Sequence, residues 1–286
     1  MLTAILSQPG ALAVAHVDLD ITTILLLVFA SALAGWIDAV VGGGGLIQLP
    51  ALLLVPGMTP IQAVATNKIG SICGTTVSAT TYLTKVKVDK SVTVPGAIFA
   101  LIGAVMGALV ASQIPEKAFT PIILVVLIGV GVFTLAKPSL GAEARLRFSG
   151  RPRMHHGVSW LIGLLVGMYD GALGPGTGSF LVIGLVAVVG FSFLQASASA
   201  KVMNWATNFG SLLFFIPAGF VVWKAGLAVA VGNVIGGFFG AKLAISKGSK
   251  FVRVVFVVVV SALVLKLGFD LSLIHISEPT RQEAIS

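Results

Sequence analysis

The sequence contains little charge. Lys and Arg together number 18, and Asp and Glu 10, in a chain of 286 residues. The surface of a soluble domain of this length needs far more charge, so this shortage excludes a soluble globular protein. The net charge of +8 does not indicate a nucleic-acid partner, because the Lys and Arg residues lie mainly in short loops, where they orient a chain in a bilayer.

Cysteine occurs once, at Cys73, which excludes an intrachain disulfide. Cys73 lies in an apolar stretch, and we interpret it as a small buried hydrophobic residue rather than a reactive thiol. The sequence has no metal-ligand spacing, no Gly-x-Ser-x-Gly nucleophile motif and no phosphate-binding Gly-Lys-Ser/Thr ending. We therefore expect no metal, no cofactor and no enzymatic activity. No Lys or Arg precedes the first apolar run, so 1–20 lacks the charged start of a signal peptide.

Long apolar runs fill most of the chain. They lie at 21–41, 61–83, 92–112, 117–136, 157–169, 178–223, 227–245 and 251–269. A transmembrane helix needs roughly 20 apolar residues, so several runs cross once, while 178–223 and the stretch 21–56 hold more than one segment. The sequence predicts an all-α polytopic membrane protein with about 8–10 transmembrane or half-membrane helices. A β-barrel would show short alternating strands instead.

The chain repeats itself around two glycine clusters. GWIDAVVGGGG at 35–45 aligns with GMYDGALGPGT at 167–177, which sets Asp38 against Asp170. QAVATNK at 62–68 then aligns with QASASAK at 195–201, in almost the same register. An ordered series of matches of this kind indicates an internal duplication, which is common in secondary transporters.

The second match sets Lys68 against Lys201, and the series defines two homologous halves. The predicted parts are an N-terminal segment at 1–20, a first transmembrane repeat at 21–137, a basic cytoplasmic loop at 138–156, a second repeat at 157–270 and a tail at 271–286. LSLIHISEPTR within the tail resembles a translated transposase-end adapter from sequencing libraries. We interpret the tail as non-native, with an ordinary polar tail as the alternative, and assign no function to it, including His275.

Loop charge favours inverted over parallel repeats. The loops at 84–91 and 137–156 carry many of the Lys and Arg residues and should be cytoplasmic. If each half crosses the membrane an odd number of times, only Lys117 and Lys224 among the loop cations lie outside. The sequence therefore predicts inverted repeats and an outside N-terminus.

The glycine clusters predict broken helices. The stretch 21–56 is too long for one crossing and too short for two, and Gly42 to Gly45 divide it. Glycine tolerates conformations that end or restart a helix, and unwound backbone survives at membrane depth only inside protein or beside a water-filled cavity. A half-helix starting near Leu46 would direct free N–H groups and its positive dipole end at the break. The second half does the same around Gly174 to Gly178.

Close helix packing is the alternative role for a membrane glycine. We assign packing to the glycines with small-xxx-small spacing, which are Gly103, Gly107, Gly236 and Gly240. If the repeats are inverted, the two broken segments could instead meet near the membrane midplane and form a site.

Paired ionisable residues lie in the same apolar segments. Lys68 and Lys201 supply point charges that suit an anion, although a structural ion pair stays open. Asp38 and Asp170 are either structural or coupling acids. The candidate substrate-binding residues are Gly42, Gly43, Gly44, Gly45, Thr66, Asn67, Lys68, Gly174, Gly176, Thr177, Gly178, Lys201, Thr207 and Asn208.

Two signatures carry a family resemblance. GWIDAVVGGGGLIQLPALLL followed by QAVATNK, and GMYDGALGPGTGSFL followed by ASASAKVMNWATN, resemble the two signatures of the sulfite exporter TauE/SafE family, also called the toluene sulfonate uptake permease family. The resemblance covers 21–269. It implies a prokaryotic plasma-membrane transporter of small sulfur-containing anions or organic acids, such as sulfite, sulfoacetate or sulfonates. Direction and substrate do not carry over.

We therefore predict a secondary transporter that moves a small anion across the plasma membrane by alternating access of its two repeats. A passive anion channel and an intramembrane enzyme are the alternatives. The expected partners are a small anionic substrate and the lipid bilayer, and the sequence leaves open whether the protein is a homo-oligomer.

Overall fold

The structure is a computed structural model that describes residues 17, 19–115, 117–119, 121–122, 125 and 152–277. All regular secondary structure in these ranges is helical, and no strand occurs in them. The helices are α2 (Ile21–Val41), α3 (Gly45–Leu53), α4 (Pro60–Leu83), α5 (Lys90–Ala111), α7 (Pro152–Ala172), α8 (Thr177–Gly184), the π-helical turn η1 (Leu185–Val189), α9 (Phe193–Phe215) and α10 (Trp223–Ser277). The predicted all-α architecture is confirmed.

Side-chain caps fix where several helices begin. Thr59 and Gln62 form a reciprocal capping box at α4, and Ser192 and Gln195 form the same box at the matched position of α9. Asp20 caps α2 by accepting a hydrogen bond from the Thr23 N–H at 3.0 Å. Hydrogen bonding from the Thr23 side chain, together with this backbone bond, lowers the pKa of the exposed Asp20 carboxyl below its ordinary value.

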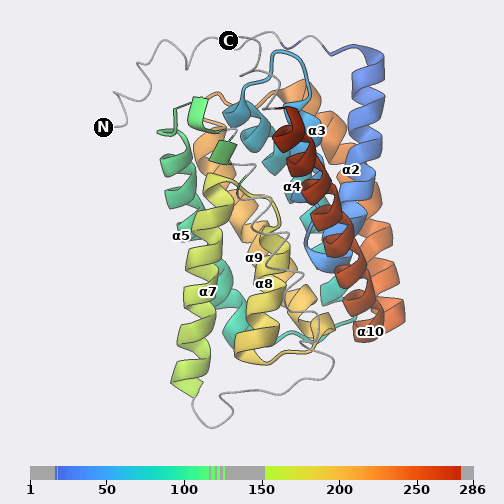
Figure 1. Ribbon diagram of the computed structural model, residues 1–286. Coiled ribbons are helices and arrows are strands. Elements are labelled where there is room, and N and C mark those ends of the chain that lie inside the picture. The colour runs from blue at the N-terminus through green and yellow to red at the C-terminus, as the bar shows by residue number, and fades with distance from the viewer. Residues whose placement is uncertain are drawn as a thin grey trace.

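The helices form two groups, each drawn from both halves of the chain (Figure 1). In one group α10 packs along α2 and α4, and in the other α5 packs along α7 and α9. The groups meet chiefly where α4 contacts α9. The chain is therefore intertwined, because the last described helix of each half lies against the first helix of the other half.

Two hydrophobic clusters show the direction of each helix. The first cluster holds Leu27 of α2, and the second holds Val40 near the end of that helix. Likewise α4 and α10 run from the first cluster to the second, whereas α5, α7 and α9 run from the second to the first. Sequence-matched helices of the two halves thus run in opposite directions, which supports inverted repeats; a two-fold relation between the halves stays a prediction.

Glycines allow the close contacts within each group. A Cβ atom at Gly103 or Gly107 of α5 would collide with carbonyl oxygens of α7, and one at Gly236 would collide with the Ala32 carbonyl of α2. A Cβ at Gly240 would lie 2.6 Å from the Trp36 carbonyl oxygen. The packing role predicted for these four glycines is confirmed.

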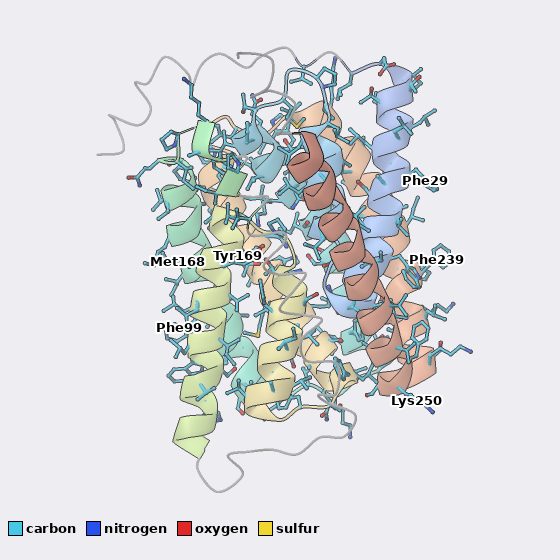
Figure 2. The ribbon with its side chains drawn as sticks, viewed as in Figure 1. Phe29, Phe99, Met168, Tyr169, Phe239 and Lys250 are labelled. Carbon is cyan, nitrogen blue, oxygen red and sulfur yellow. The ribbon has the colours of Figure 1, made fainter. Side chains whose placement is uncertain are left out.

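The outer surface is apolar. Among the residues that the structure describes, three helices are long and apolar enough to cross a membrane, namely Ile21–Val41, Lys90–Ala111 and Trp223–Val252. Figure 2 shows Phe29 and Phe239 extending outward from α2 and α10, where they are 73 % and 60 % exposed. The buried polar residues are instead concentrated on the central helices α4 and α9. An apolar exterior around a polar interior is the pattern of a membrane protein.

Some of the predicted segment boundaries agree with the helices of the structure, and others differ. The run 178–223 does hold more than one segment, because α8 and η1 end before Gly190, which has a φ of 92°. Gly248 (φ 73°) divides α10 between two predicted runs. Helix α7 begins at Pro152, within the stretch assigned to the basic loop, and the backbone of α10 continues to Ser277, past the predicted start of the tail. Residues 126–151, which include much of 117–136 and of the central loop, lie outside the described residues, as do 278–286.

Candidate functional site: a polar cavity between two broken helices

The first break separates α2 from α3. Gly42 adopts the left-handed conformation (φ 83°), and its N–H donates to the Asp38 carbonyl at 2.8 Å, which ends α2. Helix α3 restarts at Gly45 after a gap of three glycines. The predicted break is confirmed, and its backbone conformation at Gly42 is one that residues with a side chain rarely adopt.

The second break separates α7 from α8. Gly174 and Gly176 have φ values of 93° and 75°, and α8 begins at Thr177. The Tyr169 hydroxyl donates a hydrogen bond to the Pro175 carbonyl, which fixes the loop to the end of α7. Thr177 aligns with Gly45 in the sequence match, so the half-helices α3 and α8 begin at matched positions.

The two breaks are in contact. The Ser179 N–H donates to the Gly42 carbonyl at 3.0 Å, and the Ser179 hydroxyl donates to the Val41 carbonyl at 3.1 Å. A Cβ atom on Gly42 or on Gly178 would overlap the backbone of the other glycine. The expectation that the breaks meet is confirmed, while their depth in a membrane stays a prediction.

Two ion pairs, one buried and one partly buried, link the halves crosswise. The Lys68 ammonium of α4 lies 2.8 Å from Asp170 Oδ1 of α7 and also donates to the Asp170 carbonyl at 2.6 Å. The Lys201 ammonium of α9 lies 2.6 Å from Asp38 Oδ2 of α2. Each lysine therefore pairs with the aspartate of the other half. The structural ion pair that the sequence left open is present, and the anion-binding role of the lysines stays a prediction.

The ion pairs differ in their surroundings. The Asp170 side chain is 3 % exposed and also accepts a hydrogen bond from the Thr177 hydroxyl at 2.6 Å. The Asp38 side chain is 16 % exposed. Among the described residues, the Lys201 ammonium donates a hydrogen bond only to Asp38. The Asp38–Lys201 pair is thus the more open and the less cross-linked of the two.

A polar cavity lies where the breaks and the central helices meet. The cavity is small in this conformation, with room for about one water molecule, and it is partly open to solvent. The cavity is lined by Asp38, Gly42, Gly45, Asn67, Ser71, Asp170, Gly174, Gly176, Thr177, Gly178, Asn204 and Asn208. Both broken helices and both central helices contribute to this wall, so the structure brings most of the predicted site residues together.

Several predicted residues do not line the cavity. A Cβ on Gly44 would press on the Ala34 carbonyl at 2.5 Å, so this glycine serves helix contact. Gly43 lies beside Ser179, and the Thr66 hydroxyl accepts from the Val222 N–H at 3.0 Å. The Thr207 hydroxyl donates within its own helix, to the Asn204 carbonyl. Lys68 and Lys201 are fully buried, and only their carboxylate partners reach the cavity wall.

Sequence reasoning missed two lining residues, Ser71 and Asn204. They occupy matched positions in the two halves, because each follows its matched lysine at the same spacing. Ser71 lies four residues after Asn67, and Asn204 four residues before Asn208, which places each pair on one helix face. The register of the repeat combined with helical spacing would have identified both.

An amide network supports the half-helix α3. The Gln48 side chain accepts a hydrogen bond from the Asn233 amide of α10 and donates to the Asn67 carbonyl of α4 at 3.3 Å. All three side chains are buried. The network holds α3 against α4 and α10 and fixes the backbone of a lining residue, Asn67.

Backbone N–H groups at the two half-helices are available to a ligand. None of the hydrogen bonds recorded among the described residues uses the N–H of Gly45, Gly176 or Gly178. These three glycines line the cavity at the starts of α3 and α8. Helix N-termini carry unsatisfied donors and a partial positive charge, which together favour a negatively charged group.

A polar cavity enclosed by broken helices inside an apolar helical bundle is the architecture of a membrane transporter, and the relatives of the chain agree. It is 37 % identical over 250 residues to the "Probable membrane transporter protein YfcA" of Escherichia coli, covering 86 % of this chain and 89 % of that protein. A "Probable membrane transporter protein" of Haemophilus influenzae is 33 % identical over 262 residues, covering 90 % and 99 %. The chain is thus a membrane transporter. It belongs to the sulfite exporter TauE/SafE family, whose model matches residues 5–267. No solved structure matches the chain.

Proposed function

We propose that the protein is a secondary transporter that moves small sulfur-containing or organic anions, of the sulfite, sulfonate or sulfoacetate type, across the plasma membrane of a prokaryote. The observation that carries this proposal is the set of unused backbone donors at Gly45, Gly176 and Gly178 in one polar cavity. The positive end of a helix is equivalent to about half an elementary charge. Two half-helices that start at the same cavity therefore offer an anion both charge and hydrogen bonds.

Side-chain amides extend this donor set. Asn67, Asn204 and Asn208 line the cavity, and an amide can donate two hydrogen bonds to the oxygens of a sulfite or sulfonate group. The sulfur oxyanion in the family name agrees with this chemistry. We expect the anion to bind among these amides and glycines, with the two ion pairs directly behind the wall.

The two helix groups provide a route for alternating access. The cavity lies between them, and the two breaks touch across this boundary, because the Ser179 N–H donates to the Gly42 carbonyl. Rocking of one group against the other around a fixed central site would expose the cavity to each side in turn. In this proposal the N-terminus faces the outside and the substrate is the principal partner.

Flux into proteoliposomes tests the proposal. We expect saturable uptake of at least one anion from a panel of sulfite, thiosulfate, sulfonates and carboxylates, together with counterflow, which a passive channel does not show. Absence of flux for every anion would contradict the proposed function. Chemical conversion of the anion by purified protein would favour an intramembrane enzyme.

A further inference from the structure

The charges around the cavity cancel before any anion binds. The ionisable side chains at this site are Lys68, Lys201, Asp38 and Asp170, and they form two pairs of opposite charge. Tyr169 and Tyr82 also approach the aspartates and use their hydroxyl protons on the Pro175 and Ala39 carbonyls. A bound anion would therefore leave a net negative charge in a poorly solvated site, which is unfavourable unless a cation enters with it.

Two oxygen atoms of the cavity residues lack a hydrogen-bond donor. Asp170 Oδ2 and Asn67 Oδ1 are buried, and no described residue donates to either of them. Both residues line the cavity and are 2 % and 3 % exposed. The Asp170 carboxylate uses its other oxygen for Lys68 and Thr177. Buried acceptors without a donor are rare and unfavourable, and a bound cation or a proton would satisfy them.

The position of Asp170 in its helix also favours a cation. Asp170 lies in the last turn of α7, which ends at Ala172. The carbonyl end of a helix carries partial negative charge, and transporters with broken helices coordinate sodium ions or protons at such ends. The matched Asp38 is less suited, because its side chain is more exposed and neither of its oxygens is a buried atom without a donor.

We infer that the cavity also binds a monovalent cation, a sodium ion or a proton, at Asp170 Oδ2 and Asn67 Oδ1, and that this cation is transported together with the anion. The inference rests on the proposed anion transport. A sodium ion would take the two oxygens as ligands. A proton taken up from water would bond to Asp170 Oδ2 and leave the carboxyl neutral, so that Lys68 keeps its positive charge for the anion.

The test measures the cation separately from the anion. Purified protein without any anion is examined for binding of radiolabelled sodium, and for protonation of a buried carboxyl by infrared difference spectroscopy. Methanesulfonate flux in proteoliposomes is then measured at a clamped membrane potential, under a sodium gradient at equal pH or a pH gradient without sodium. Methanesulfonate stays anionic over the whole pH range used, so a pH effect reports on the protein.

We expect one of the two cations to bind and to drive the flux. Asn67→Ala should weaken the apparent affinity for that cation roughly tenfold or more, as loss of a charge-assisted contact implies, and Asp170→Asn should abolish cation dependence. Ser197→Ala is the matched control, because the Ser197 hydroxyl is also buried without a partner but does not line the cavity. It should leave the cation response unchanged.

The outcomes separate the two proposals. Anion flux that is indifferent to both gradients, or cation affinity that is unchanged in Asn67→Ala, would overturn the cation site and leave the proposed transport intact. Cation binding without flux of any anion in the panel would support the site and count against the proposed transport. If Asp170→Asn does not fold, Asn67→Ala decides alone.

Discussion

Lys68 and Asp170, which are 102 positions apart in the chain, form a buried ion pair that joins α4 to the end of α7. Removing one member of a buried pair leaves an uncompensated charge and costs about 3–5 kcal/mol. Lys68→Met should therefore greatly reduce the amount of folded protein. The double variant Lys68→Met with Asp170→Asn should recover much of it, as measured by fluorescence-detected size exclusion.

A mismatched double variant is the control for this pair. Lys68→Met with Asp38→Asn removes two charges as well, but it leaves Asp170 and Lys201 without their partners. We expect lower expression than in either single variant. Equal recovery by both double variants would show that the crosswise pairing is wrong.

The two aspartates should differ in their effect on stability. Asp170 is 3 % exposed and holds two side-chain partners, whereas Asp38 is 16 % exposed and holds one. Asp170→Asn should lower the midpoint of thermal unfolding in detergent more than Asp38→Asn does, because a more buried and more cross-linked charge leaves more groups unsatisfied. A larger loss for Asp38→Asn would contradict the described asymmetry.

Two glycine variants distinguish the effect of the contact between the breaks from the effect of backbone strain. Gly42→Ala should abolish transport, because its Cβ would overlap the backbone of Gly178 and its φ of 83° is unfavourable for alanine. Gly57 has a similar φ of 78°, but a Cβ there meets nothing within 4 Å. Gly57→Ala should thus show only the conformational cost of about 1–2 kcal/mol and keep its flux. If both variants show the same flux and stability, Gly42 is needed only for its backbone conformation and not for the contact with Gly178.

The amide network should stabilise the half-helix α3. Asn233→Ala leaves the Gln48 side chain with an unpaired carbonyl oxygen in a buried position. The expected loss of stability is about 1–3 kcal/mol, measured as a lower unfolding midpoint. Asn233→Ala with Gln48→Leu should be less destabilised than the single variant, since no polar group is then stranded.

Cysteine labelling in a Cys73→Ser background tests the topology. Lys87 and Lys247 are exposed at the end of the molecule that holds the second hydrophobic cluster, and Lys224 is exposed at the end that holds the first. Cysteines at Lys87 and Lys247 should react from the cytoplasmic side, and one at Lys224 only from the periplasmic side. Labelling of the Lys247 position only from the periplasm would refute the inverted arrangement.

The sequence contained enough to predict the broken helices, because consecutive glycines and the internal repeat mark them directly. It could not predict the partners of Lys68 and Lys201. An internal alignment shows which residues correspond, but not which ones meet in space. The sequence also could not predict the amide contact between Gln48 and Asn233. Their matched positions in the other half hold Phe180 and Ala100, so the repeat gives no signal for an amide at either position.

The intertwined packing of α2 and α10 has a consequence for biosynthesis. Ala32 of α2 contacts Gly236 of α10, although most of the chain lies between them in sequence. At synthesis rates of roughly 5–20 residues per second, α2 waits on the order of 10–40 s after its own translation before its partner helix exists. During that interval its small-residue face has only lipid, the insertion machinery or a chaperone to cover it. The protein can therefore finish folding only after nearly the whole described chain has left the ribosome.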